Sequence, residues 1–247
     1  MLRWIVIGAF VGCSSSASAP VHDAAPAPHP SKDAAPAHPP GDAPAADAGA
    51  AVTIVDAPMA WSDERAALTL AYRRQHSDPA ATDLTIDPRV IILHYTAGGS
   101  AKSTRSYFDN VRIEAERKDL ARAGAVNVSS HYIVDRDGTI YRIQPETRFA
   151  RHCIGMNHIA IGIENVGDES KFPLTDAQVA ADAALIRDLV HRFPNITHVL
   201  GHYEVMKFHH PYYQELDPKY RNDKPDPGKR FMALVRENIA DLKLSGL

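Results

Sequence analysis

Two histidines in this sequence each follow an apolar run, and this arrangement points to a metal site. The run "RVIIL" leads into His94, and the run "ITHVLG" leads into His202. Runs of this length and composition predict β-strands that are covered on both faces. Ligands of α/β proteins gather where strand ends meet loops, and a strand end holds an imidazole rigidly. Imidazole suits Zn²⁺, so the two histidines predict part of a zinc site.

A catalytic zinc site needs a third protein ligand, because such sites combine three side chains with one position open to water. Our candidate is Asp226. It lies between two prolines in "KPDPG", a stiff turn that fixes the direction of its side chain just before a predicted helix. His209 and His210 are alternative ligands, since they stand in the elongated loop 203–223 that leads into this turn. Adjacent residues of an unanchored loop rarely both point at one metal ion.

The elements that bring these side chains together are predicted from the pattern along the chain. Ser62 is a predicted N-cap, and Thr175 has capping-box spacing to Gln178 ahead of an amphipathic segment. Residues 129–143 alternate around an Asp-Gly pair and predict a hairpin, with a turn that can be longer than two residues. We expect helices at residues 61–76, 101–121, 174–193 and 228–242, and further strands at 89–94, 158–165 and 196–202. This alternation predicts an α/β fold with a mixed central β-sheet flanked by helices.

The first 13 residues predict export. They carry one basic residue and a short apolar run, which is too short to span a bilayer and reads as a secretory signal. The run ends at Cys13 in "VGC", which resembles the lipobox of bacterial lipoproteins, where the cysteine is acylated. Cleavage of a plain signal after "ASA" is the alternative. We expect an exported protein of the cell envelope, in the periplasm and anchored to a membrane by its lipid.

Residues 14–58 predict a disordered linker ahead of a folded domain at residues 59–247. The segment is rich in Ala, Pro and Asp and holds nine of the 18 prolines of the chain, so it offers little to bury. It also carries a charge of −4, and Arg3 adds +1, so the net charge of −3 leaves the domain close to neutral. A neutral domain is not steered toward nucleic acid or an anionic membrane surface. We expect a monomer that touches a membrane only through its lipid. If Cys13 is acylated, Cys153 has no disulfide partner.

Five blocks of the sequence, in order, resemble the zinc-dependent N-acetylmuramoyl-L-alanine amidases, a family that shares its fold with the peptidoglycan-recognition proteins. The blocks are "ILHYTAG", "SSHYIVDRDGTIY", "RHCIGMNHIAIGIEN", "LGHYE" and "KPDPG". The similarity covers roughly residues 85–240, which is nearly all of the expected domain. It implies this family's fold and a single Zn²⁺ held by His94, His202 and Asp226.

The resemblance also implies roles for three other residues. Glu164 matches the family's catalytic acid, and it shares a strand face with Ala160 and Gly162, which leaves room for substrate and water. We expect it to act as general acid and base; a half-exposed strand carboxylate is the alternative. Lys224 matches a lysine that would stabilise the developing oxyanion, with a surface lysine as the alternative. His152 matches a position near the substrate, so we expect it to bind substrate, unless it is a structural histidine.

Two other features of the sequence leave alternatives open. Cys153 beside His152 would allow a thiol nucleophile, but no Cys–His–Asn signature supports this, and a small buried thiol is far commoner. The three tyrosines of the elongated loop either form a wall for a sugar–peptide groove or pin the loop to the domain; they are Tyr212, Tyr213 and Tyr220.

These observations predict an enzyme that hydrolyses the amide between N-acetylmuramic acid and L-alanine, with peptidoglycan or muropeptides as its substrate. One alternative is a module of the same fold that binds muropeptides without hydrolysis. Another is an exported zinc hydrolase that acts on a different peptide amide.

Overall fold

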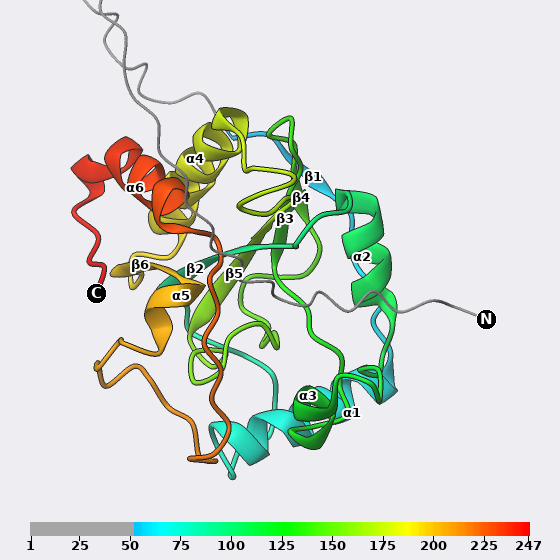
Figure 1. Ribbon diagram of the computed structural model, residues 1–247. Helices are drawn as coiled ribbons and strands as arrows, with labels where there is room; N and C mark the ends of the chain where they lie inside the picture. Colours follow the sequence, from blue (N-terminus) through cyan, green and yellow to red (C-terminus); the bar gives the residue numbers. More distant parts are fainter. Residues whose placement is uncertain (1–51) are drawn as a thin grey trace, which may run out of the picture. The chain divides into compact units, whose positions relative to one another are not determined.

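The structure, a computed structural model, describes residues 52–247 (Figure 1). Cys13, the predicted signal segment and most of the predicted linker lie outside the described residues. None of the helices within residues 52–247 has the length and apolar character that a membrane crossing would require.

The described residues form one mixed β-sheet. Its strands are β1 (Ile54–Asp56), β2 (Val90–Tyr95), β3 (Tyr132–Val134), β4 (Ile140–Arg142), β5 (Ala160–Asn165) and β6 (His198–Gly201). From one edge to the other their order is β1-β4-β3-β5-β2-β6. The hairpin β3–β4 is antiparallel and the other neighbours are parallel, so the predicted mixed sheet and hairpin are confirmed. The backbone N–H of Asp135 donates to the carbonyl of Thr139, so the hairpin turn is longer than two residues.

Helices cover both faces of the sheet (Figure 1). They are α1 (Asp63–His76), α2 (Ala101–Asp109), α3 (Lys118–Arg122), α4 (Asp176–Arg192), α5 (His202–Val205), α6 (Lys229–Asn238) and the 3₁₀ helix η1 (Ala240–Leu242). The predicted caps are confirmed: the Ser62 hydroxyl accepts from the backbone N–H of Arg65, and Thr175 and Gln178 form a complete capping box. Each such cap stabilises its helix by about 1 kcal/mol.

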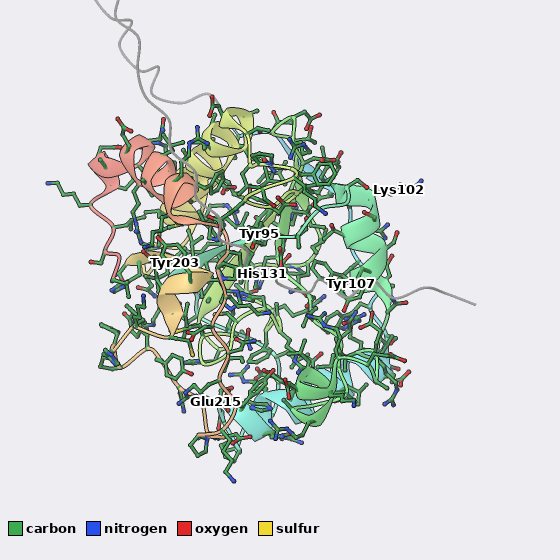
Figure 2. The ribbon with its side chains drawn as sticks, in the orientation of Figure 1. Tyr95, Lys102, Tyr107, His131, Tyr203 and Glu215 are labelled. Atoms are coloured by element: carbon green, nitrogen blue, oxygen red, sulfur yellow. The ribbon has the colours of Figure 1, made fainter. Side chains whose placement is uncertain are left out.

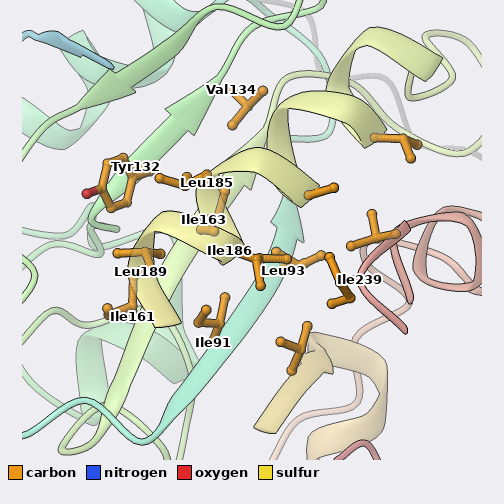
Figure 3. Packing of buried hydrophobic residues seen from close by; sticks show 14 of the residues in the cluster. Ile91, Leu93, Tyr132, Val134, Ile161, Ile163, Leu185, Ile186, Leu189 and Ile239 are labelled. Carbon is orange, nitrogen blue, oxygen red and sulfur yellow. The ribbon is translucent and has the colours of Figure 1, made fainter. Parts of the chain in front are cut away.

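The core lies on both faces of β2, as the apolar run predicts. Val90, Ile91, Ile92 and Leu93 are each 0% exposed. Ile91 and Leu93 pack with residues of β5, α4 and α6, and Figure 3 shows them beside the α4 leucines and isoleucine. Val90 and Ile92 point to the opposite face, against Met156 and Phe208. Full burial of one such side chain contributes about 1.5–3 kcal/mol, so the strand that carries His94 is firmly anchored.

Three sequence-based boundaries were wrong. The single helix expected at 101–121 is two helices, α2 and α3, because Asn110 is extended and the backbone N–H of Ile113 bonds to the carbonyl of Ala125 instead of continuing the helix. β1 lies inside the predicted linker, where Ile54 packs against the core and pairs with Ile140, so the folded part begins before residue 59. β6 ends at Gly201, and His202 is the first residue of α5 rather than the last residue of the strand.

Candidate metal centre and active site

The parallel strands bring three predicted site residues to the same edge of the sheet. β2 runs parallel to both β5 and β6, so the carboxyl ends of the three strands lie together. In this register His94 lies directly opposite Glu164, and Gly201, just before His202, lies opposite Leu93. Residues that are 108 positions apart in the sequence, His94 and His202, therefore become neighbours.

Asp226 reaches the same edge from the end of the elongated loop. The backbone N–H of Tyr203 donates to the carbonyl of Asp226 at 3.0 Å, which ties the end of the loop to the start of α5. Asp226 is 6% exposed and lies shortly before α6. The loop thus begins and ends at the metal centre.

His94, His202 and Asp226 form the one group of His, Cys, Asp and Glu side chains within residues 52–247 that could hold a metal ion. Nδ1 of His94 lies 3.0 Å from Nδ1 of His202, and each nitrogen lies 3.1 Å from Oδ2 of Asp226. Neighbouring ligand atoms of a tetrahedral zinc site, with bonds of roughly 2.0–2.1 Å, lie roughly 3.3 Å apart. Two imidazoles and one carboxylate at these separations fit a divalent metal that keeps one position open.

The protonation of this group also suits a metal. Burial, together with the neighbouring His202, lowers the pKa of His94 to about 4, so the imidazole of His94 is neutral. Burial acts to raise the pKa of Asp226, but the contacts with His202 and His94 outweigh it and hold the pKa well below its usual range. A neutral imidazole and an ionised carboxylate are the states in which these side chains bind metals.

Glu164 lies beside the metal group with an unsatisfied carboxylate. Its Oε2 is inaccessible and has no hydrogen-bond partner among the described residues. Burial raises the pKa of Glu164 well above its usual value, the charge of Asp226 raises it further, and Lys224 opposes both. A carboxyl group perturbed in this way, next to a metal group, is a candidate for proton transfer.

A cavity of about 530 Å³ opens in front of these residues. The metal group, Glu164 and Lys224 all line it, so the sequence-predicted metal and catalytic residues come together at one site. Tyr95 of β2 and Tyr107 of α2 also line it (Figure 2). Arg117 and Tyr220 line the cavity as well, and it is large enough for a small peptide or sugar fragment.

His152 lies behind His94 and lines the cavity as well. Its Nδ1 lies 3.0 Å from Nε2 of His94, and its Nε2 lies 3.2 Å from the carbonyl oxygen of Ala160. Both ring nitrogens therefore have partners within the protein. The predicted contact of His152 with substrate stays a prediction.

The sequence left the roles of several loop residues open, and the structure gives a different answer for each. His210 packs its ring against Phe208 and Tyr212, and neither His209 nor His210 belongs to the metal group. Tyr220 is buried, accepts a hydrogen bond from Arg151 and lines the cavity, so it both pins the loop and forms part of the wall.

Tyr213 packs against Gly155 and beneath Arg221, and it is not among the residues that line the cavity. Cys153 is a buried free thiol, and burial raises its pKa well above its usual value, which argues against a thiolate nucleophile.

Sequence reasoning missed several residues around the site. Oδ1 of Asn157 accepts from the backbone N–H groups of both His152 and Cys153, and Asn157 lines the cavity, but nothing in the local pattern marks it. Tyr107 and Arg117 also line the cavity. They were hidden because the segment that carries them was predicted to be one exposed helix, and the break between α2 and α3 turns it toward the site.

Comparison with known proteins places this chain in a family. Residues 84–229 match the family model for N-acetylmuramoyl-L-alanine amidase. This range includes the metal group, Glu164, His152 and Lys224, and it confirms the resemblance seen in the sequence. The chain belongs to the N-acetylmuramoyl-L-alanine amidase family.

Individual relatives are similar over different lengths. The endolysin of Escherichia phage T7 is 31% identical over 101 residues, which are 39% of this chain and 66% of the endolysin. The endolysin amidase LysCS from Clostridium intestinale URNW is 22% identical, with a TM-score of 0.49, over 78% of this chain and 97% of that one. An AmpD structure is 20% identical, with a TM-score of 0.48, over 75% of this chain and 94% of that one.

Proposed function

We propose that this chain is a zinc-dependent amidase that hydrolyses the bond between N-acetylmuramic acid and L-alanine in peptidoglycan. The observation that carries the proposal is the shared cavity of His94, His202, Asp226 and Glu164 in a chain of this family. The first three would hold one Zn²⁺ per chain. Lewis-acid activation of water and of the scissile carbonyl is the chemistry that zinc supplies at such residues.

Glu164 acts as the proton carrier in this proposal. Its carboxylate accepts a proton from the attacking water and then donates it to the nitrogen of the leaving L-alanine, as the C–N bond breaks. Its half-buried position beside the metal group favours the protonated form between the two transfers. A nearby divalent cation favours the ionised form that begins the cycle.

Lys224 stabilises the negative charge that develops on the carbonyl oxygen. It lines the same cavity, and its charge acts on both Glu164 and His94. Oxyanion donors of this kind contribute about 3–4 kcal/mol to lowering the barrier.

We also propose that the substrate is reached outside the cytoplasm. Peptidoglycan lies in the cell envelope, which agrees with the predicted export signal and with acylation of Cys13. Peptidoglycan or its muropeptide fragments would then be the partners of this chain, with a membrane touched only through the lipid. The export signal and acylation are tested by mass spectrometry of the mature N-terminus in a bacterial membrane fraction.

Product analysis tests the activity. Purified full-length protein is incubated with peptidoglycan and zinc, and the soluble products are identified by mass spectrometry. Free stem peptides that begin with L-alanine, absent from a Glu164→Gln reaction, are the expected result. Cut cross-links would indicate a hydrolase of another peptide amide. Binding without any soluble product would indicate a module that only recognises muropeptides.

A further inference from the structure

Three successive polar contacts connect the sheet to the metal group. The carbonyl oxygen of Ala160 lies 3.2 Å from Nε2 of His152. Nδ1 of His152 lies 3.0 Å from Nε2 of His94. Nδ1 of His94 lies 3.1 Å from Oδ2 of Asp226. The chain of contacts thus passes through both imidazoles, from one ring nitrogen to the other.

The protons of this chain can be assigned from its first member. A backbone carbonyl only accepts hydrogen bonds, so Nε2 of His152 carries a hydrogen and donates it to Ala160. Among residues 52–247 no carboxylate lies within hydrogen-bond distance of this ring, whose two nitrogens face Ala160 and His94, so no partner stabilises a positive charge on it and the ring is neutral. A neutral imidazole has one N–H, and Nδ1 of His152 is therefore an acceptor. Nε2 of His94 must then be the donor between the two rings.

This assignment leaves Nδ1 of His94 without a hydrogen. That nitrogen offers its lone pair to the point where Nδ1 of His202 and Oδ2 of Asp226 also converge. The other tautomer of His94 would place two lone pairs against each other at the 3.0 Å contact with His152. The hydrogen-bond chain therefore selects the one tautomer of His94 that can bind a metal through Nδ1.

The surroundings hold His152 in the place that this selection needs. A Cβ atom on residue 162 would lie 2.7 Å from Nδ1 of His152, so only glycine there admits the ring at this position. The backbone N–H of His152 is bound by Oδ1 of Asn157 at 2.8 Å. The rings of His94 and His152 are perpendicular, at 89°, with centroids 5.2 Å apart.

We propose that His152 is a positioning residue for the metal site: it accepts the Nε2 hydrogen of His94 and so fixes His94 in the tautomer whose Nδ1 binds zinc. The proposal rests on the metal site of the proposed function and deepens it. It gives His152 a role other than hydrogen bonding to substrate, because both of its ring nitrogens already have protein partners. His202 has no comparable partner for its Nε2 within residues 52–247, which makes His94 the ligand that is fixed in this way.

Zinc affinity of matched variants tests the proposal. His152→Phe keeps a ring but removes the acceptor, and zinc affinity should fall by roughly 10–100-fold, the usual effect of losing a partner behind a metal ligand. His152→Asn keeps an acceptor close to the position of Nδ1 and should restore affinity to within about threefold of wild type. His158→Asn is the control, because His158 stands on the same loop and lies outside the cavity lining. Competition with a chromogenic chelator measures the zinc affinity of the wild type and of the three variants.

A second measurement needs no variant. Long-range ¹H–¹⁵N NMR of the zinc-loaded wild-type protein, with resonances assigned, reports which ring nitrogens of His94 and His152 carry a hydrogen. The expected result is hydrogen on Nε2 of His94 and on Nε2 of His152. Hydrogen on Nδ1 of His152, or equal zinc affinity of folded His152→Phe and wild type, would overturn the proposal.

These outcomes are independent of the substrate. If the protein binds zinc as described but releases no stem peptides, the proposed function fails and the role of His152 stands. If it is an active amidase whose zinc affinity does not change when residue 152 is substituted, the role of His152 fails and the function stands.

Discussion

Nδ1 of His94 lies 3.1 Å from Oδ2 of Asp226, across 132 positions of sequence. The histidine comes from the end of a fully buried strand, and the aspartate comes from the end of a long loop. Two atoms that both offer lone pairs repel at this distance unless a proton or a cation lies between them. A bound cation would stabilise this pair and would hold the end of the loop at the sheet edge.

The first prediction concerns this pair. Asp226→Asn removes the charged ligand atom, and we expect zinc affinity to fall by more than about 100-fold and the zinc-dependent rise in Tm to disappear. Thermal unfolding with and without zinc measures both. Asp223→Asn is the matched control, since Asp223 is exposed in the same segment. The same zinc-dependent rise in Asp226→Asn and wild type would contradict the assignment of Asp226 as a ligand.

The second prediction separates proton transfer from metal binding. Glu164→Gln keeps the shape of the side chain but cannot carry the proton, so kcat should fall by roughly 10²–10⁴-fold. Zinc content, measured by elemental analysis, should stay at one ion per chain because Glu164 is not among the three ligand residues. Glu237→Gln on the exposed side of α6 is the control. A loss of zinc in Glu164→Gln would mean that this carboxylate binds the metal instead.

The third prediction concerns Lys224. Lys224→Met removes the charge that faces the developing oxyanion, and a loss of about 3 kcal/mol corresponds to a decrease in kcat of roughly 100–200-fold with KM little changed. Steady-state kinetics on a muropeptide substrate gives both constants. The exposed Lys219→Met serves for comparison. A rise in KM at unchanged kcat would show that Lys224 binds the ground state of the substrate.

The fourth prediction is a pH dependence of stability that arises away from the site. Asp182 of α4 is fully buried, with one hydrogen bond from Asn165 and an unpartnered Oδ1. Burial raises its pKa from 3.8 to about 7, and the bond from Asn165 only partly offsets this. Its stabilising contribution is therefore complete below about pH 4, is lost progressively as the pH rises to about 7, and stays lost above that.

Asp182→Asn removes this titration. The variant should gain stability relative to wild type as the pH rises from 4 to 8, by an amount on the order of 4 kcal/mol, which is the upper limit set by a shift of this size. Urea unfolding at several pH values measures the difference. Asp119→Asn, at an exposed position, should follow wild type throughout. A constant difference between Asp182→Asn and wild type at every pH would mean that the carboxyl group does not titrate in this range.

The sequence predicted the site better than the elements at its rim. His94 and His202 were visible because buried strands leave a strong apolar pattern, and the parallel register then places their ends together. β1 was missed because three residues between alanines and prolines carry almost no pattern; only pairing with β4 makes them a strand. The break between α2 and α3 depends on bonds from Ile113 and Asn127 to backbone groups at 125 and 111, which no local propensity encodes.

The role of His152 shows a different limit. The residue types at 152, 160 and 162 are plain in the sequence, and the strand face of residue 162 was predicted correctly. The direction of a backbone carbonyl and the donor at each ring nitrogen depend on three-dimensional contacts. Which ring nitrogen carries a hydrogen is therefore determined by the fold and not by the local sequence.

The hydrogen bond between the backbone N–H of Tyr203 and the carbonyl of Asp226 closes the long loop at its base. Both ends of the loop are thereby fixed by groups that do not depend on what lies between them. The entropy of such a closed segment grows only with the logarithm of its length. Insertions or deletions in its middle should thus be tolerated during evolution. The part of the loop that lines the cavity could then change in sequence while His94, His202 and Asp226 stay the same.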